Sequence, residues 1–345
     1  MQFASTAKPA TAVLYDSDFG RNIDNVLALA VLHGFASKMQ ARVSALTINY
    51  PCLEAAELCD IIEGFYRKAV TGPGATYMSA PAIGVIDARG KPAEAPALVT
   101  GTLAKQADGG KPQWQSNVRH WNDTAVPANL IRNDLAAQYD GNAVMVATGA
   151  MTNLSRLLAL HDTAPLIAAK VKMLVIAGGG FAAGAIDSGF RADATAAKHV
   201  LAEWPTPIVF CGREMEKTFL FPGQCIGKDF SYVPVHPIVE ACRAYRAMPY
   251  DAPACALAAM LYAVGPNDGY FTASKPGTVS LGSDGRTSFN ESAGGKHSYL
   301  TAVAAKHDEA IQRFTAMVSA EPVVIRPFRK QQKEEPPKEA PTAKS

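Results

Sequence analysis

The sequence lacks the features of a membrane protein or a charge-driven nucleic-acid binder. No run of about 18 apolar residues occurs in its 345 residues, so we expect no membrane span. Its 33 Lys and Arg nearly balance 31 Asp and Glu, which excludes nucleic-acid binding by bulk charge. With 48% hydrophobic and 19% charged residues, the composition predicts a soluble globular protein with one or two large cores.

The six cysteines form no C-x-x-C pair of the kind that zinc sites use. They lie far apart in mostly apolar surroundings, so we expect reduced, buried thiols. The opening residues also lack the basic start and apolar core of a secretory signal. We therefore expect a cytoplasmic protein, with an exported, trimmed form as the alternative.

Short apolar runs alternate with helical patterns along most of the chain. The expected strands lie at residues 12–15, 43–48, 143–147, 171–177 and 208–210. The expected helices lie at residues 23–32, 53–66, 129–139, 154–160, 194–204, 236–247, 253–264 and 310–319, and Gly34 is expected to stop the first of them. This order predicts an α/β, Rossmann-like fold, with a mainly parallel sheet flanked by helices on both faces.

The remaining segments set the domain limits. Residues 71–112 are rich in Gly, Pro and Ala and predict a long loop or an insertion that could cover a site, and residues 265–298 predict hairpins. We expect one domain over residues 11–325, with residues 1–10 as an amino-terminal extension. Residues 326–345 are charged, proline-rich and poor in aromatics, so we expect a disordered tail.

Candidate chemistry follows the strands, because ligands bind beyond the carboxyl ends of strands in an open parallel sheet. Asp16 and Asp18 follow the first strand, and Asp24 lies in the first turn of the next helix. Crowded carboxylates repel one another unless they share a cation or a proton, so this loop suggests metal binding or acid–base work. Helix capping alone is the alternative. Thr148 and the triple glycine that begins at Gly178 follow two later strands, where backbone can approach a ligand.

These segments resemble a known family. Residues 16–29 are similar to the amino-terminal aspartate signature of the inosine–uridine nucleoside hydrolases, and residues 146–154 to their central threonine–asparagine element. Later segments match in the same order at residues 177–180, 193–209 and 253–264. The resemblance implies the nucleoside hydrolase fold. It also implies hydrolysis of the N-glycosidic bond of a ribonucleoside with a calcium ion held by aspartates.

The resemblance assigns roles to individual residues. Asp18 matches the aspartate that both ligates calcium and accepts the proton of the attacking water, and Thr148 matches a backbone-carbonyl ligand. Asp24 matches an aspartate that contacts the ribose hydroxyls, and Asn49 loosely matches a further ribose-contacting residue. We expect a supporting role for Asp16, Gly178, Cys255 and Ala256.

Two expected calcium ligands are missing. Asn25 stands where the resemblance expects an aspartate, and Cys255 and Ala256 stand where it expects a histidine or tryptophan followed by a ligating aspartate. Asp251 lies in the preceding loop and does not simply replace them. Asp18 alone leaves a dication largely uncompensated, so we expect calcium binding to be weak or absent.

The expected ribose-binding glutamate and asparagine are also altered, to Asp187 and Gly189. Two hypotheses follow. The chain is either an active N-ribosyl hydrolase with a rebuilt site, or an inactive relative that binds a ribosyl ligand or a protein partner. The expected small-molecule ligand is a ribonucleoside or another ribosyl compound, and the resemblance implies a dimer or tetramer.

A third hypothesis concerns another enzyme class. Asp16 and Asp18 also resemble the aspartate pair of haloacid-dehalogenase-type phosphatases. Those enzymes need a hydroxyl group two residues after the second aspartate, where this chain has Gly20. The sequence therefore disfavours this class.

Overall fold

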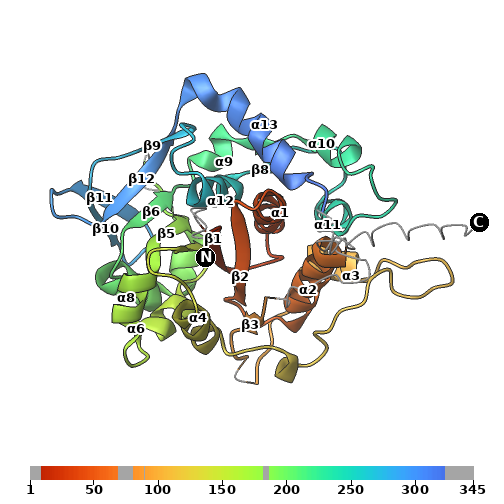
Figure 1. Cartoon of the computed structure of the whole chain (residues 1–345), viewed down its shortest axis with the longest axis horizontal. Helices are drawn as coiled ribbons and strands as arrows, with labels where there is room; N and C mark the ends of the chain where they lie inside the picture. Colours follow the sequence, from red (N-terminus) through yellow and green to blue (C-terminus); the bar gives the residue numbers. More distant parts are fainter. Residues whose placement is uncertain (1–8, 69–80, 89, 182–185, 323–345) are drawn as a thin grey trace, which may run out of the picture.

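The computed structural model describes residues 9–68, 81–88, 90–181 and 186–322. They form a sheet of ten strands with helices on both faces (Figure 1). Its strands are β1 (Thr11–Ser17), β2 (Ala41–Ile48), β3 (Ile83–Val85), β4 (Ala143–Thr148), β5 (Val171–Ala177), β6 (Ile208–Cys211), β9 (Phe271–Ala273), β10 (Gly277–Leu281), β11 (Thr287–Glu291) and β12 (His297–Ala302). A second, two-stranded sheet pairs β7 (Leu220–Phe221) with β8 (Ala252–Pro253).

The centre of the large sheet is parallel. Its order is β11-β10-β12-β6-β5-β4-β1-β2-β3, and every pair from β12 to β3 is parallel. The hairpin expected in residues 265–298 is present as β10 and β11, which pair antiparallel. The predicted α/β class is therefore confirmed.

The helices divide into two layers. On one face lie α1 (Ile23–Ser37), α2 (Leu53–Lys68), α11 (Pro237–Tyr245), α12 (Cys255–Val264) and α13 (His307–Val318). On the other face lie α4 (Pro127–Ala136), α5 (Thr152–Leu158), α6 (Thr163–Lys170) and α8 (Ala194–Glu203). Shorter helices, found in the connections, are α3 (Ala97–Leu103), α7 (Ser188–Ala192), α9 (Met215–Thr218) and α10 (Gly223–Lys228), with 3-10 turns at Trp121–Asp123 and Ala304–Lys306.

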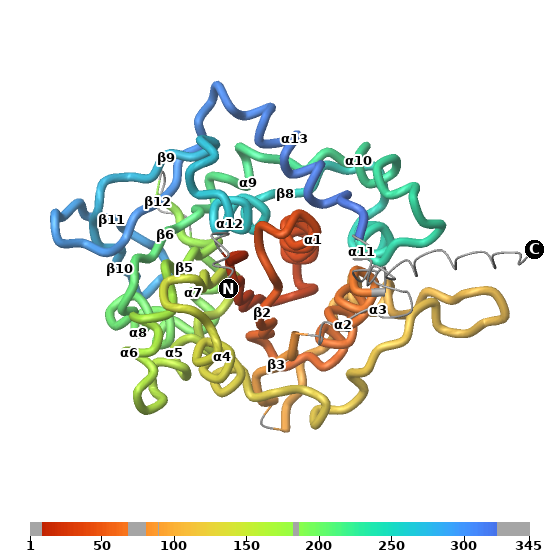
Figure 2. Tube along the Cα trace, viewed as in Figure 1, coloured from red at the N-terminus to blue at the C-terminus, as the bar shows by residue number. Residues whose placement is uncertain are grey.

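The alternation of side chains along β1 explains the two layers. Val13 and Tyr15 pack into the core on the α1 side, whereas Ala12 and Leu14 pack into the core on the α4 side. Because both faces are covered, all four side chains are buried. Figure 2 shows α12 beside α1, although the two helices are far apart in the sequence, and this contact matters for the site.

Two local expectations were wrong. Gly34 does not end the first helix, since α1 continues to Ser37. A Cβ at Gly34 would lie 2.2 Å from the carbonyl oxygen of Met317, so this glycine allows α13 to approach α1 closely. Residues 71–112 are not one long loop, because β3 and α3 lie within them, and the alternative of an insertion stays open. The tail at residues 326–345 lies outside the described residues.

The state of the cysteines agrees with the expectation of reduced, buried thiols. All six cysteines are free, and only Cys225 is not fully buried. None of the described helices is both long enough and apolar enough to cross a membrane.

Candidate functional site

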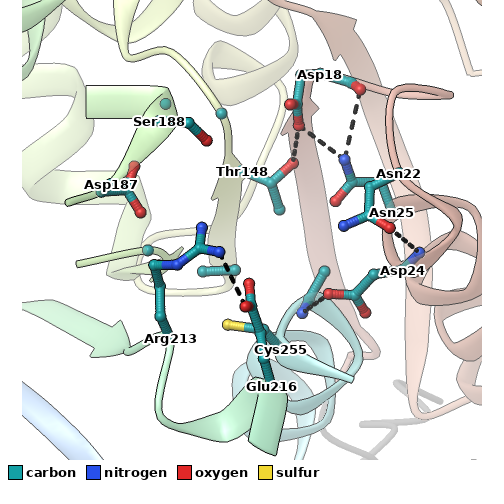
Figure 3. A pocket seen from close by; sticks show the side chains of 15 residues that line it. Asp18, Asn22, Asp24, Asn25, Thr148, Asp187, Ser188, Arg213, Glu216 and Cys255 are labelled. Carbon is teal, nitrogen blue, oxygen red and sulfur yellow. Dashed lines mark hydrogen bonds and ion pairs between the residues drawn. The ribbon is translucent and has the colours of Figure 1, made fainter. Parts of the chain in front are cut away.

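A pocket opens at the carboxyl ends of the central strands, where the sequence placed the candidate chemistry (Figure 3). The loops after β1, β4, β5 and β6 meet there with the first turn of α12. The residues that line it are Asp18, Asn22, Asp24, Asn25, Thr148, Gly149, Ala177, Gly178, Asp187, Ser188, Gly189, Arg213, Glu216, Cys255 and Ala256. Of the residues predicted for the site, all but Asp16 and Asn49 line this pocket.

Asp16 lies beneath the pocket and holds the strand ends together. Its Oδ1 accepts hydrogen bonds from Thr47 Oγ1 at 2.6 Å and Asn153 Nδ2 at 2.8 Å. Its Oδ2 accepts one from Asn49 Nδ2 at 3.1 Å. Burial raises the pKa of Asp16 to about 6, although these donors oppose the shift. Asp16 thus ties β1, β2 and α5 together beneath the pocket.

Asp18 presents its carboxylate to the pocket. The Oδ1 atom accepts hydrogen bonds from Asn25 Nδ2 at 2.7 Å and from Thr148 Oγ1 at 3.2 Å. Within the described residues, no hydrogen bond is made to Oδ2. Burial raises the pKa of Asp18, and the nearby Arg21 partly opposes this shift. A carboxylate with one anchored and one open oxygen, and with an increased proton affinity, is suited to act as a base.

Asp24 faces the start of α12. Its Oδ2 accepts from the backbone N–H of Ala256 at 2.7 Å, and its Oδ1 accepts from that of Leu257 at 3.2 Å. These donors belong to the first turn of the helix, where backbone N–H groups have no intrahelical partner. Burial raises the pKa of Asp24 to about 7. Both oxygens of Asp24 thus already cap α12, and the predicted ribose contact would use their remaining lone pairs.

Asp187 has a similar structural role on the other side of the pocket. Its Oδ1 accepts from the N–H of Phe190 at 2.9 Å, as the N-cap of α7, and its Oδ2 accepts from the N–H of Gly179 at 3.0 Å. Gly189 follows in α7, and a Cβ there would lie 2.5 Å from the carbonyl oxygen of Gly149. The loop after β4 therefore occupies the space that an asparagine side chain at position 189 would need.

Thr148 and Asn49 form a pair. Asn49 Nδ2 donates to the carbonyl oxygen of Thr148 at 2.7 Å as well as to Asp16, and its side chain is buried. The carbonyl that the resemblance offers as a calcium ligand thus already accepts a hydrogen bond. Asn49 lies below the pocket lining, so its predicted ribose contact stays a prediction.

The donor set does not fit a calcium ion. Among the described residues there is no group of three or more His, Cys, Asp or Glu side chains that could hold a metal. Asn25 directs an N–H, and not an oxygen, at Asp18, and Ala256 has no donor side chain. Asp251 accepts from the N–H of Gly223 at 2.9 Å, at the start of α10, and does not line the pocket. Side-chain N–H groups already donate hydrogen bonds to Asp18 Oδ1 and to the carbonyl oxygen of Thr148, which are oxygens that a cation would otherwise bind.

Sequence reasoning missed two charged residues. Arg213 and Glu216 line the pocket directly after β6, and Arg213 Nη2 lies 3.0 Å from Glu216 Oε2. The backbone N–H of Arg213 also donates to the carbonyl of Gly179 at 2.9 Å, which fixes this loop beside the one after β5. The rule that placed Thr148 at a strand end would have found both residues, had it been applied to β6.

Solved structures with the same fold were found. A plant nucleoside hydrolase, PpNRh1, is similar over 90% of this chain and 100% of its own, with 19% identity and a TM-score of 0.66. The inosine-uridine preferring nucleoside hydrolase of Bacillus anthracis is similar over 89% of this chain and 99% of its own, with 14% identity and a TM-score of 0.61. The effector protein XOO4466 is similar over 92% and 95%, with 12% identity and a TM-score of 0.60. No curated protein sequence matches.

The sequence gives independent support for the same relationship. The family model for the inosine-uridine preferring nucleoside hydrolases matches residues 13–314, which include every strand-end loop of the pocket and α12. The mostly parallel sheet flanked by helices agrees with this match. The chain therefore belongs to the inosine-uridine preferring nucleoside hydrolase family.

Proposed function

We propose that this chain binds the ribosyl part of an N-riboside in the pocket and hydrolyses its N-glycosidic bond slowly, without calcium. The observation that carries the proposal is the 2.7 Å hydrogen bond from Asn25 Nδ2 to Asp18 Oδ1. It holds the carboxylate in place, as a metal ion could, while Oδ2 stays open to a water molecule. Membership of the family supplies the reaction class.

The chemistry required is that of an oxocarbenium-like transition state. Positive charge develops on the ribose ring as the bond to the base breaks. The carboxylate of Asp18 faces the pocket and stabilises that charge. Asp18 takes a proton from the water that attacks C1′. Asn22 and Ser188, at the pocket edge, supply an amide and a hydroxyl group that can bind ribose hydroxyls.

Release of free base from inosine and uridine tests the proposal, measured once with excess EDTA and once with calcium. We expect slow release at the same rate in both. Asp18→Asn should lower the rate about 100-fold or more, because it removes the base. Asp284→Asn, an equal change at an exposed turn, should have no effect. Release that requires added calcium would refute the metal-independent mechanism.

A second candidate function is binding of a ribosyl ligand without cleavage. It is favoured by the loss of charge at Asn25 and Ala256, which leaves less negative potential than three carboxylates would give. Calorimetric titration with ribose or inosine distinguishes the two functions. Binding without release of base under any condition would establish this second function and exclude the first.

A further inference from the structure

Cleavage of an N-riboside requires two proton transfers. The attacking water loses a proton, and the departing nitrogen base must gain one, because a free base anion is a poor leaving group. Asp18 serves the first transfer. A second acidic group must therefore reach the pocket from a different side.

Glu216 occupies such a position. It comes from α9, after β6, whereas Asp18 follows β1, and Figure 3 shows the two carboxyl groups at different ends of the pocket. Its Oε2 lies 3.0 Å from Arg213 Nη2, and no hydrogen bond to Oε1 is found in the described part of the chain. The side chain is 29% exposed, so it is accessible from the pocket and still partly shielded from water. Glu216 thus resembles Asp18 in having one anchored and one open oxygen.

The other acidic side chains of the pocket lack this freedom. Asp24 and Asp187 each use both oxygens to accept backbone N–H groups. The thiol of Cys255 donates to the carbonyl of Cys211 at 3.2 Å, and its hydrogen bonding to Cys211, together with burial, raises its pKa well above the ordinary value. A thiol so weakly acidic is a poor proton donor at neutral pH. Among the described lining residues, Glu216 has the carboxyl group best placed to donate.

The surroundings of Glu216 favour its protonated form. Burial raises the pKa, and the carboxylate of Asp187 adds to the shift, while Arg213 and Lys217 oppose it. Asp24, from α1, and Cys255, from α12, also interact electrostatically with Glu216. The net direction is upward, which is the direction needed for a carboxyl group that donates a proton near neutral pH.

We propose that Glu216 is the general acid of this site and acts with Asp18 as a metal-independent carboxyl pair. The inference rests on the proposed hydrolysis. Glu216 donates its proton to a ring nitrogen of the base, and the C1′–N bond breaks with its electron pair remaining on the base. Water oxygen bonds to C1′, and its proton passes to Asp18. Exchange with solvent then returns a proton to Glu216 and removes one from Asp18.

The test compares two ribosides with Glu216→Gln. Inosine needs a proton on its base, whereas 4-nitrophenyl riboside releases a stable phenolate that needs none. We expect kcat on inosine to fall about 100-fold or more, and kcat on the nitrophenyl riboside to stay within a few fold. Glu216→Asp should recover part of the rate on inosine. Glu309→Gln, an exposed change on α13, should alter neither rate.

Each other outcome overturns the inference. Equal losses on both ribosides, or no loss on either, would show that Glu216 donates no proton. In that case, activity of the unaltered chain in EDTA would still support the proposed function. No cleavage of either riboside by the unaltered chain would overturn both proposals. If Glu216→Gln does not fold, pH profiles of the unaltered chain decide. The rate on inosine alone should fall at high pH, and parallel profiles would refute the inference.

Discussion

Asn25→Asp tests the physical reason for the proposed calcium independence. Asn25 Nδ2 lies 2.7 Å from Asp18 Oδ1, so the variant brings two carboxylates together where an amide now donates. Two like charges about 4 Å apart repel by roughly 1 kcal/mol in water and 4 kcal/mol at an effective dielectric constant of 20. We therefore expect the variant, in EDTA at pH 8, to lose about 1–4 kcal/mol of unfolding free energy.

Calcium should reverse this loss. A carboxylate oxygen about 2.4 Å from a dication gains roughly 3 kcal/mol even in a medium as polar as water, which is about a 100-fold gain in affinity. Mutual repulsion of the two carboxylates destabilises the ion-free variant, and this repulsion is relieved when the ion binds. Adding Ala256→Asp supplies a third carboxylate at the pocket lining and should raise the affinity further.

The assay is thermal unfolding with and without calcium, together with calorimetric titration. We expect Tm to rise with calcium in Asn25→Asp and more so in the double variant, and to stay constant in the unaltered chain. Asn22→Asp is the matched control, because it adds the same charge three residues earlier, at the N-cap of α1. The Asn22 side chain accepts from the backbone N–H of Asp24 and makes no hydrogen bond to Asp18 within the described residues. Tight calcium binding by the unaltered chain, or no gain in the double variant, would refute the reasoning.

Three further predictions concern stability. Because burial raises the pKa of Asp24 to about 7, the free energy of unfolding falls as pH rises from the ordinary carboxyl pKa to about 7. Asp24→Asn removes this titration. In the variant, the slope of the urea-derived unfolding free energy against pH should therefore be smaller in this range, by up to about 1.4 kcal/mol per pH unit. An unchanged slope would contradict this. Gly189→Asn should lower Tm, because its Cβ would lie 2.5 Å from the backbone of the loop after β4. Ser188→Asn, a change at the neighbouring exposed residue, should leave Tm unchanged. Equal Tm values for the two variants would show that the loop adapts. Gly34→Ala should destabilise by about 1–3 kcal/mol, since its Cβ would lie 2.2 Å from the backbone of α13. Gly64→Ala, in α2 with no atom within 4 Å of the added Cβ, should stabilise by about 0.5–1 kcal/mol, and the same sign for both alanines would refute the packing argument.

The sequence by itself determined the class of the fold. Short apolar runs such as residues 171–177, which form β5 with the predicted limits, alternate with helical patterns, and this order allows little besides a parallel sheet covered on both faces. The rule that ligands bind at strand ends then placed Asp18, Thr148 and Gly178 at one pocket. These inferences succeed because periodicity and chain order are local properties.

Only the tertiary structure decided what the polar groups of the site do. Asp24 caps α12, more than 200 residues further along the chain, with hydrogen bonds to Ala256 and Leu257. The amide of Asn25 meets Asp18, and Glu216 reaches the same pocket from α9. The function of a carboxyl group depends on which donors and charges face it. Those neighbours come from distant segments, and packing, not periodicity, brings them together.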